Sequence, residues 1–126
     1  MTPAQVLEQR RRLIIDQDVE GFIALFAPNG VMEMPFGGSG LPDRVEGQAA
    51  IAELSRRAAD GLRFDDFENV VVHETGDPEV VVAETVTRAT HLKSGKPFVA
   101  PSIQVFRIRD GKILLFRAYT GPATGV

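Results

Sequence analysis

Long strand-forming segments separated by short turn signals fill the second half of the chain and constrain its fold most. Residues 63–74, 79–92, 97–109 and 112–120 are rich in Val, Thr, Ile and Phe, which favour extended backbone. Gly76-Asp77-Pro78 is a turn signal, residues 93–96 form a hairpin loop, and Asp110-Gly111 is the strongest hairpin signal in the chain. The sequence therefore predicts a meander of long strands, mostly antiparallel.

The first half of the chain carries three helix signals and one short strand. Thr2, Pro3 and Gln5 form a capping signal for a first helix, and Asp18 can cap a second one. Pro28-Asn29-Gly30 ends the second helix. The remaining expected elements are a short strand at 31–35, a loop rich in Pro and Gly up to residue 42, and a third helix at 48–60.

Three helices followed by a meander predict an α+β fold in a single domain that spans residues 1–126. A strongly curved sheet can wrap such helices and leave a cone-shaped cavity between the two layers. We expect the tail from Gly121 to Val126 to be frayed.

Composition excludes several classes of function. The net charge of -3 argues against nucleic-acid binding, and the absence of cysteine excludes thiolate and disulfide chemistry. Two histidines without suitably spaced acids argue against a metal site. No apolar run reaches the roughly 18 residues of a membrane helix, and no signal-peptide core is evident, so we expect no membrane partner and a cytoplasmic location.

Four segments together resemble the NTF2-like superfamily, in particular its SnoaL-like branch of polyketide cyclases and ketosteroid isomerases. The resemblance implies a cone-shaped fold with three N-terminal helices on a curved sheet, a homodimer formed through the outer sheet face, and no cofactor. The fold hosts both enzymes and non-catalytic binders, so the resemblance is weaker for activity than for fold. The four segments are DVEGFIALF (18–26), VMEMPFG (31–37), GQAAIAEL (47–54) and VFRIRDGKILLFRAY (105–119).

Three positions where the resemblance implies an acid hold other residues. Met34 stands just before Pro35, where ketosteroid isomerases have their general-base aspartate. Gln104 stands where those enzymes place a protonated aspartic acid, and Ala118 where relatives often carry an acid. A glutamine amide can donate a hydrogen bond to a carbonyl oxygen but cannot donate a proton. The usual carboxylate chemistry therefore has no candidate at these positions.

His91 and Gln104 are the predicted catalytic pair. Alternation puts His91 on one strand face with Thr85 and Thr87, and the resemblance implies that this face looks into the cavity. An imidazole can exchange a proton near neutral pH, with Gln104 orienting or polarising a carbonyl. The alternatives are a partly solvated histidine at a strand end and a glutamine satisfied by its neighbours. We expect the cavity wall to include Met32, Met34, Phe36, Thr87, Phe106, Phe116, Ala118 and Thr120.

Several charged residues admit more than one interpretation. Arg10 could bind a carboxylate or enolate, but a solvated Arg10-Arg11-Arg12 face is favoured. Asp18 is better explained as a helix cap than as a base, and the role of Asp16 stays open. Glu33, Arg107, Arg109, Arg117 and Tyr119 are expected on the surface or at a dimer interface.

Three functions remain open at this point. The first is a cofactor-free enzyme that carries out cyclase-type or isomerase-type acid–base chemistry on a hydrophobic carbonyl compound. The second is a protein that binds an apolar ligand without changing it. The third is an interaction module whose pocket is filled by its own side chains.

Overall fold

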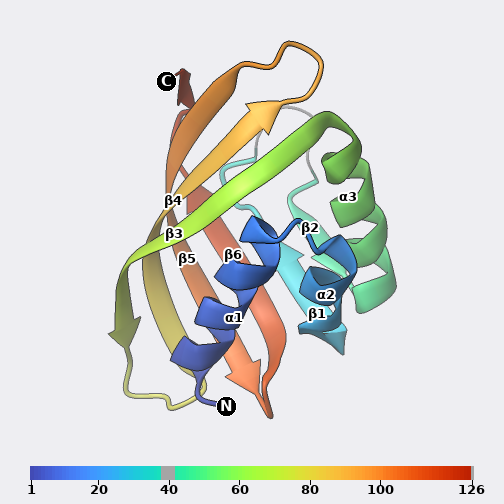
Figure 1. Cartoon of the computed structure of the whole chain (residues 1–126). Coiled ribbons are helices and arrows are strands. Elements are labelled where there is room, and N and C mark those ends of the chain that lie inside the picture. The colour runs from blue at the N-terminus through green and yellow to red at the C-terminus, as the bar shows by residue number, and fades with distance from the viewer. Residues whose placement is uncertain (38–41, 126) are drawn as a thin grey trace.

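A computed structural model describes residues 1–37 and 42–125. Three helices lie against one curved sheet, as Figure 1 shows, which confirms the predicted α+β class. The helices are α1 (Pro3–Ile15), α2 (Val19–Ala24) and α3 (Gln48–Gly61). The strands are β1 (Phe26–Glu33), β2 (Arg44–Glu46), β3 (Leu62–Glu74), β4 (Val80–His91), β5 (Pro97–Arg109), β6 (Lys112–Thr120) and β7 (Thr124–Gly125).

The long strands form the predicted antiparallel meander. The strand order is β2-β1-β6-β5-β4-β3, and β1 runs parallel to β6 while the other neighbours are antiparallel. In β5, Ser102, Gln104, Phe106 and Ile108 alternate with more exposed residues and are buried. This inner face of the sheet therefore turns towards the helices.

The helix caps follow the predicted chemistry. The Thr2 hydroxyl accepts from the Gln5 amide while the Gln5 side chain accepts from the Thr2 amide, which makes a full capping box. The Asp18 carboxylate accepts from the Gly21 amide at 2.8 Å and caps α2. Both predicted N-terminal caps are therefore present, and they fix where α1 and α2 begin.

Three local predictions were wrong. β1 begins at Phe26 rather than at Val31, because Phe26 is buried and pairs with Ile113 of β6 across an irregular register. The short strand β2 was missed, because a three-residue strand has little pattern of its own and forms by pairing with β1. The tail is not entirely frayed, since β7 pairs with β5 at Phe98 and Val99.

The core lies between α1 and the inner sheet face. Val6 and Leu7 of α1 are fully buried, as are Phe106 and Ile113 of the sheet. The expected loop, which follows the expected strand at 31–35 and extends to residue 42, lies partly outside the described residues, which exclude 38–41. In the described part of the chain, no helix is long and apolar enough to cross a membrane.

Candidate functional site

A cavity of about 540 Å³ lies between the helices and the inner face of the sheet. Its size suits a small molecule, because ligand pockets commonly measure roughly 300–1,000 Å³. Most of its wall is apolar, with aromatic rings from Phe22, Phe64, Phe67, Phe98 and Phe116. Polar groups are few. One set is buried between α1 and the sheet, and a second set lies on more exposed residues, which we call the rim.

Arg10 is the central residue of the buried set. Val6, Leu7, Arg10 and Ile14 are the buried residues of α1 and lie on one face of the helix. Arg10 is only 1% exposed, whereas Arg12 is exposed and Arg11 pairs with Asp66 at 2.9 Å. The favoured interpretation of a solvated basic face was therefore wrong for Arg10.

Three aromatic rings surround the Arg10 guanidinium. Its central carbon lies 4.6 Å from the ring centroid of Phe67, 4.9 Å from that of Phe106 and 5.0 Å from that of Phe116. Such contacts stabilise a cation. Burial nevertheless lowers the pKa of Arg10 to about 9. The side chain remains protonated at neutral pH and carries a desolvated positive charge into the cavity.

One polar side chain holds Arg10 in place. Nη2 of Arg10 donates to Oε1 of Gln104 at 2.9 Å, and Gln104 is 4% exposed. The Gln104 amide nitrogen donates weakly to the Ser102 hydroxyl at 3.4 Å, and that hydroxyl lies 3.2 Å from the Thr120 hydroxyl. The other terminal nitrogen of Arg10, Nη1, is buried and has no partner within residues 1–37 and 42–125. The buried set therefore retains an unused, charged donor.

The rim contributes Gln17, Asp18 and Arg63. Arg63 is held by Asp65 at 2.6 Å and by the Thr90 hydroxyl at 3.2 Å. Asp18 uses Oδ1 for its helix cap. Among the described residues that line the cavity, Asp18 is the only one with a carboxylate side chain.

The structure brings most of the predicted wall residues together. Phe106 is not among the described residues that line the cavity, contrary to the prediction, because it is fully buried and stacks on Phe116 with ring centroids 5.2 Å apart. Whether any of these side chains contacts a ligand stays a prediction. Gln104 and the predicted residues Met32, Met34, Thr87, Phe116, Ala118 and Thr120 all line the cavity.

Phe36 does not share the inner face as predicted. It is 75% exposed and packs edge-on against Tyr119, with centroids 5.3 Å apart. The prediction extended strand alternation past Glu33, where β1 ends and a turn begins. Alternation loses its meaning once the backbone leaves the strand.

His91 lies apart from Gln104. It is exposed at the end of β4 and is not among the described residues that line the cavity. Its ring is tilted by 32° against that of Phe98, with ring centroids 4.7 Å apart. The register pairs Gln104 with Ala83, and Thr90 with Pro97 near the hairpin. The expected partnership of His91 with Gln104 was therefore wrong, because the two residues occupy distant positions along the β4–β5 ladder. A catalytic role for His91 stays a prediction.

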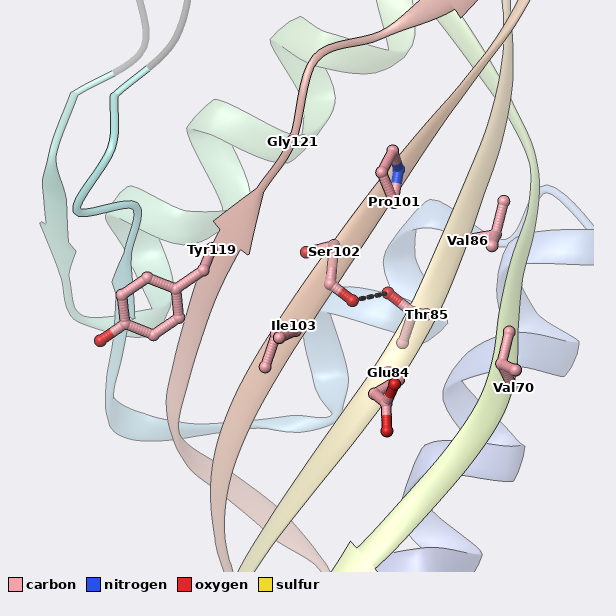
Figure 2. A pocket seen from close by; sticks show the side chains of 9 residues that line it. All are labelled: Val70, Glu84, Thr85, Val86, Pro101, Ser102, Ile103, Tyr119 and Gly121. Atoms are coloured by element: carbon pink, nitrogen blue, oxygen red, sulfur yellow. Dashed lines mark hydrogen bonds between the residues drawn. The ribbon is translucent and has the colours of Figure 1, made fainter.

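The outer face of the sheet carries a second depression of about 370 Å³, which Figure 2 shows. Val70, Glu84, Ile103 and Tyr119 lie around it, and the Thr85 hydroxyl donates to the Ser102 carbonyl at 3.3 Å. This depression is shallow and open, and its described lining contains no buried charge. The inner cavity is the better candidate for a small-molecule site.

Charged residues near this outer face are paired. Glu33 accepts a hydrogen bond from Arg117 at 3.0 Å and one from Arg44 at 2.8 Å. These bonds lower the pKa of Glu33, and the bond from Arg117 has the larger effect.

Within the described residues, no group of three or more His, Cys, Asp or Glu side chains could hold a metal ion.

The helical period was a usable signal for Arg10. Counting from Val6 and Leu7, the inward positions of α1 continue at Arg10 and Ile14. The basic run Arg10-Arg11-Arg12 favoured a solvated face, although the helical period puts Arg10 in the middle of the apolar stripe of α1.

The chain belongs to the SnoaL-like domain family, whose model matches residues 8–116. An uncharacterised PhzA/B-like protein of Pseudomonas aeruginosa is 33% identical over 122 residues, which cover 97% of this chain and 86% of the relative. The family accounts for the NTF2-like arrangement of helices on an unclosed sheet.

Two solved structures show how widely this fold is used. A Δ5-3-ketosteroid isomerase from a Mycobacterium species matches with a TM-score of 0.86, 22% identity and full coverage of both chains. A computationally designed 17-OHP binder matches with a TM-score of 0.83, 20% identity and full coverage of both chains. At these identities the likeness shows the fold alone, and one fold carries both an enzyme and a binder.

Proposed function

We propose that this protein binds a hydrophobic, carbonyl-bearing small molecule in its inner cavity and acts on it as a cofactor-free enzyme of the isomerase or cyclase type. One observation carries the proposal. The cavity is apolar over most of its wall and contains a buried donor pair, Arg10 and Gln104, 2.9 Å apart. A ligand with an apolar body and one oxygen acceptor would match this arrangement of an apolar wall and a buried polar pair.

The donor pair supplies the electrostatic part of the chemistry. Removing a proton next to a carbonyl places negative charge on its oxygen. A fixed guanidinium in a site of low dielectric stabilises that charge strongly, and no reorganisation is needed at the moment of reaction. Gln104 fixes the guanidinium by accepting from Nη2, which leaves Nη1 for the substrate.

Asp18 is the better candidate for the proton acceptor. It lines the cavity and uses Oδ1 for its cap, while His91 lies outside the described lining. A carboxylate can remove a proton from carbon when the resulting enolate is stabilised elsewhere.

The non-catalytic alternative rests on a specific feature of the wall. Met34, Gln104 and Ala118 all line the cavity, and none of the three carries an acid. A ligand held by Arg10 and Gln104 could leave unchanged. The expected homodimer and the expected cytoplasmic location stay predictions.

Proton exchange separates these functions. The protein is incubated with tetralone in deuterium oxide, and NMR follows both ligand binding and loss of the proton next to the carbonyl. We expect binding and exchange above the buffer rate, and a drop of about a hundredfold in Asp18→Asn, because general acid–base groups contribute roughly 10²–10⁴-fold. Asparagine caps helices as well as aspartate, so this variant keeps α2.

The controls divide the hypotheses. His91→Ala and Arg12→Met should exchange at the wild-type rate. Binding without exchange would support the non-catalytic binder, and the absence of binding by any apolar carbonyl probe would support the interaction module. Unchanged exchange in Asp18→Asn with loss in His91→Ala would return the proton acceptor to His91.

A further inference from the structure

Arg10 is a buried cation without an internal counterion. Among the buried polar side chains of the described residues, Arg10 is the only charged one. It belongs to none of the ion pairs formed by those residues. The nearest basic neighbour along the helix, Arg11, is neutralised by Asp66. The aromatic rings and the Gln104 carbonyl oxygen solvate the charge but do not cancel it.

An uncompensated buried charge is costly unless a ligand supplies its partner. A neutral carbonyl would offer Arg10 a hydrogen bond but would leave the net charge in place. A carboxylate would do both, and charge-assisted bonds of this kind are the stronger class. Arg10 lines a cavity that can hold a small molecule, and its buried Nη1 has no partner among the described residues, so an anion in the cavity would meet an unpaired cationic donor.

We propose that the ligand of this cavity is an apolar, aromatic or alicyclic carboxylic acid whose carboxylate pairs with Arg10. This inference rests on the proposed function and narrows its substrate class: the carbonyl group that Arg10 binds is that of the carboxylate itself, and removal of a proton from the adjacent carbon by Asp18 would give an enediolate that the same guanidinium stabilises. One carboxylate oxygen binds Nη1, and the Gln104 amide, which makes only a weak 3.4 Å bond to Ser102, is the adjacent second donor. The apolar body of the ligand lies against Phe67 and Phe116.

Three matched probes test the proposal: naphthoate, naphthamide and methyl naphthyl ketone. They share a ring system and differ mainly in charge at the polar group. Titration calorimetry near neutral pH should show naphthoate binding about tenfold or more tighter than either neutral probe, which corresponds to about 1.4 kcal/mol. Equal affinities would overturn the carboxylate proposal and leave the proposed function standing. Absence of binding by all three would remove both.

Two variants place the preference at Arg10. Arg10→Met should abolish the preference for naphthoate while neutral probes still bind, and Arg12→Met on the same helix should behave as wild type. Gln104→Glu keeps Arg10 but gives it an internal carboxylate at the position now 2.9 Å away. It should therefore also abolish the preference, by occupying the cation rather than removing it.

Gln104→Glu keeps the test decisive if Arg10→Met fails to fold. Circular dichroism and ketone binding report whether each variant is intact. A naphthoate preference that survives in a folded Gln104→Glu or Arg10→Met variant would overturn the assignment to Arg10.

Discussion

Arginines on the outer face of the sheet are paired with carboxylates, whereas the arginine that packs against the inner face is not. On the outer side, Arg117 pairs with Glu33, and Arg107 and Arg109 both pair with Glu79. On the inner side, Arg10 contacts aromatic rings and donates a hydrogen bond to the Gln104 amide, but it pairs with no carboxylate among the described residues. Solvent and paired acids stabilise the charges of the outer arginines, whereas the charge of Arg10 has no partner until a ligand enters the cavity. The difference marks the inner face as the functional one.

The largest expected effect compares two nearby positions of β5 on opposite faces. Phe106→Ala should lower the free energy of unfolding by about 3–5 kcal/mol, because it removes a fully buried ring that supports both Phe116 and Arg10. Ile103→Ala, at a residue that is 50% exposed, should cost much less. Urea denaturation measures both. Similar losses at the two positions would contradict the assignment of faces.

A smaller effect should have opposite signs on the two faces. Arg10→Met should raise the free energy of unfolding by about 1 kcal/mol, because replacing an uncompensated buried charge with an apolar side chain of similar size removes a desolvation cost. Arg117→Met should lower it by less than about 1 kcal/mol, the usual value of an exposed ion pair. Thermal and urea unfolding without ligand give both values.

Ligand sharpens this comparison. Added naphthoate should stabilise the wild type and Arg117→Met but not Arg10→Met, because binding to the folded state raises its stability. A clear loss of stability in ligand-free Arg10→Met would mean that the aromatic rings and Gln104 already satisfy the charge. The contrast between the faces would then be weaker than the contacts suggest.

The smallest effect concerns the outer ion pairs and their pH dependence. Hydrogen bonds from Arg109 and then Arg107 lower the pKa of Glu79 from its ordinary value of 4.5 to about 2. A lowered pKa means that the folded state favours the ionised carboxylate. The resulting stability is complete above about pH 4.5 and is lost as the pH falls through about 2.

Glu79→Gln should therefore be slightly less stable than the wild type near neutral pH and equally stable once the pH lies below about 2. Paired urea denaturation curves at the two pH values test this expectation. A difference that persists at the lower pH would assign the loss to packing rather than to the charge of Glu79.

Much of the fold was predictable because its signals are local. The capping groups of Thr2 and Asp18, the alternation in β5 and the Asp110-Gly111 turn each depend on neighbouring residues, and the structure contains all of them. The wrong predictions lie where pairing with a distant strand decides the outcome. β2 forms by pairing with β1, the start of β1 by pairing with β6, and the short β7 by pairing with β5.

The site was predictable only in part for a related reason. Alternation placed Gln104, Phe116 and Thr120 on the inner face, since strand periodicity fixes which side a residue takes. It could not fix how far along the ladder His91 lies from Gln104, which depends on the register of β4 against β5. It also could not continue to Phe36, which follows the end of β1.

The sequence by itself determined the family, the order of the three helices and the four long strands, and the absence of acids at positions 34, 104 and 118, because these follow from residue identity and short-range spacing. Tertiary structure decided what surrounds Arg10. Its place as the eighth residue of α1, on the inward face, is local, but its environment comes from Phe67, Gln104 and Phe106, which lie on strands far along the chain. Whether an arginine is solvated or buried as an unpaired cation depends on which side chains converge on it.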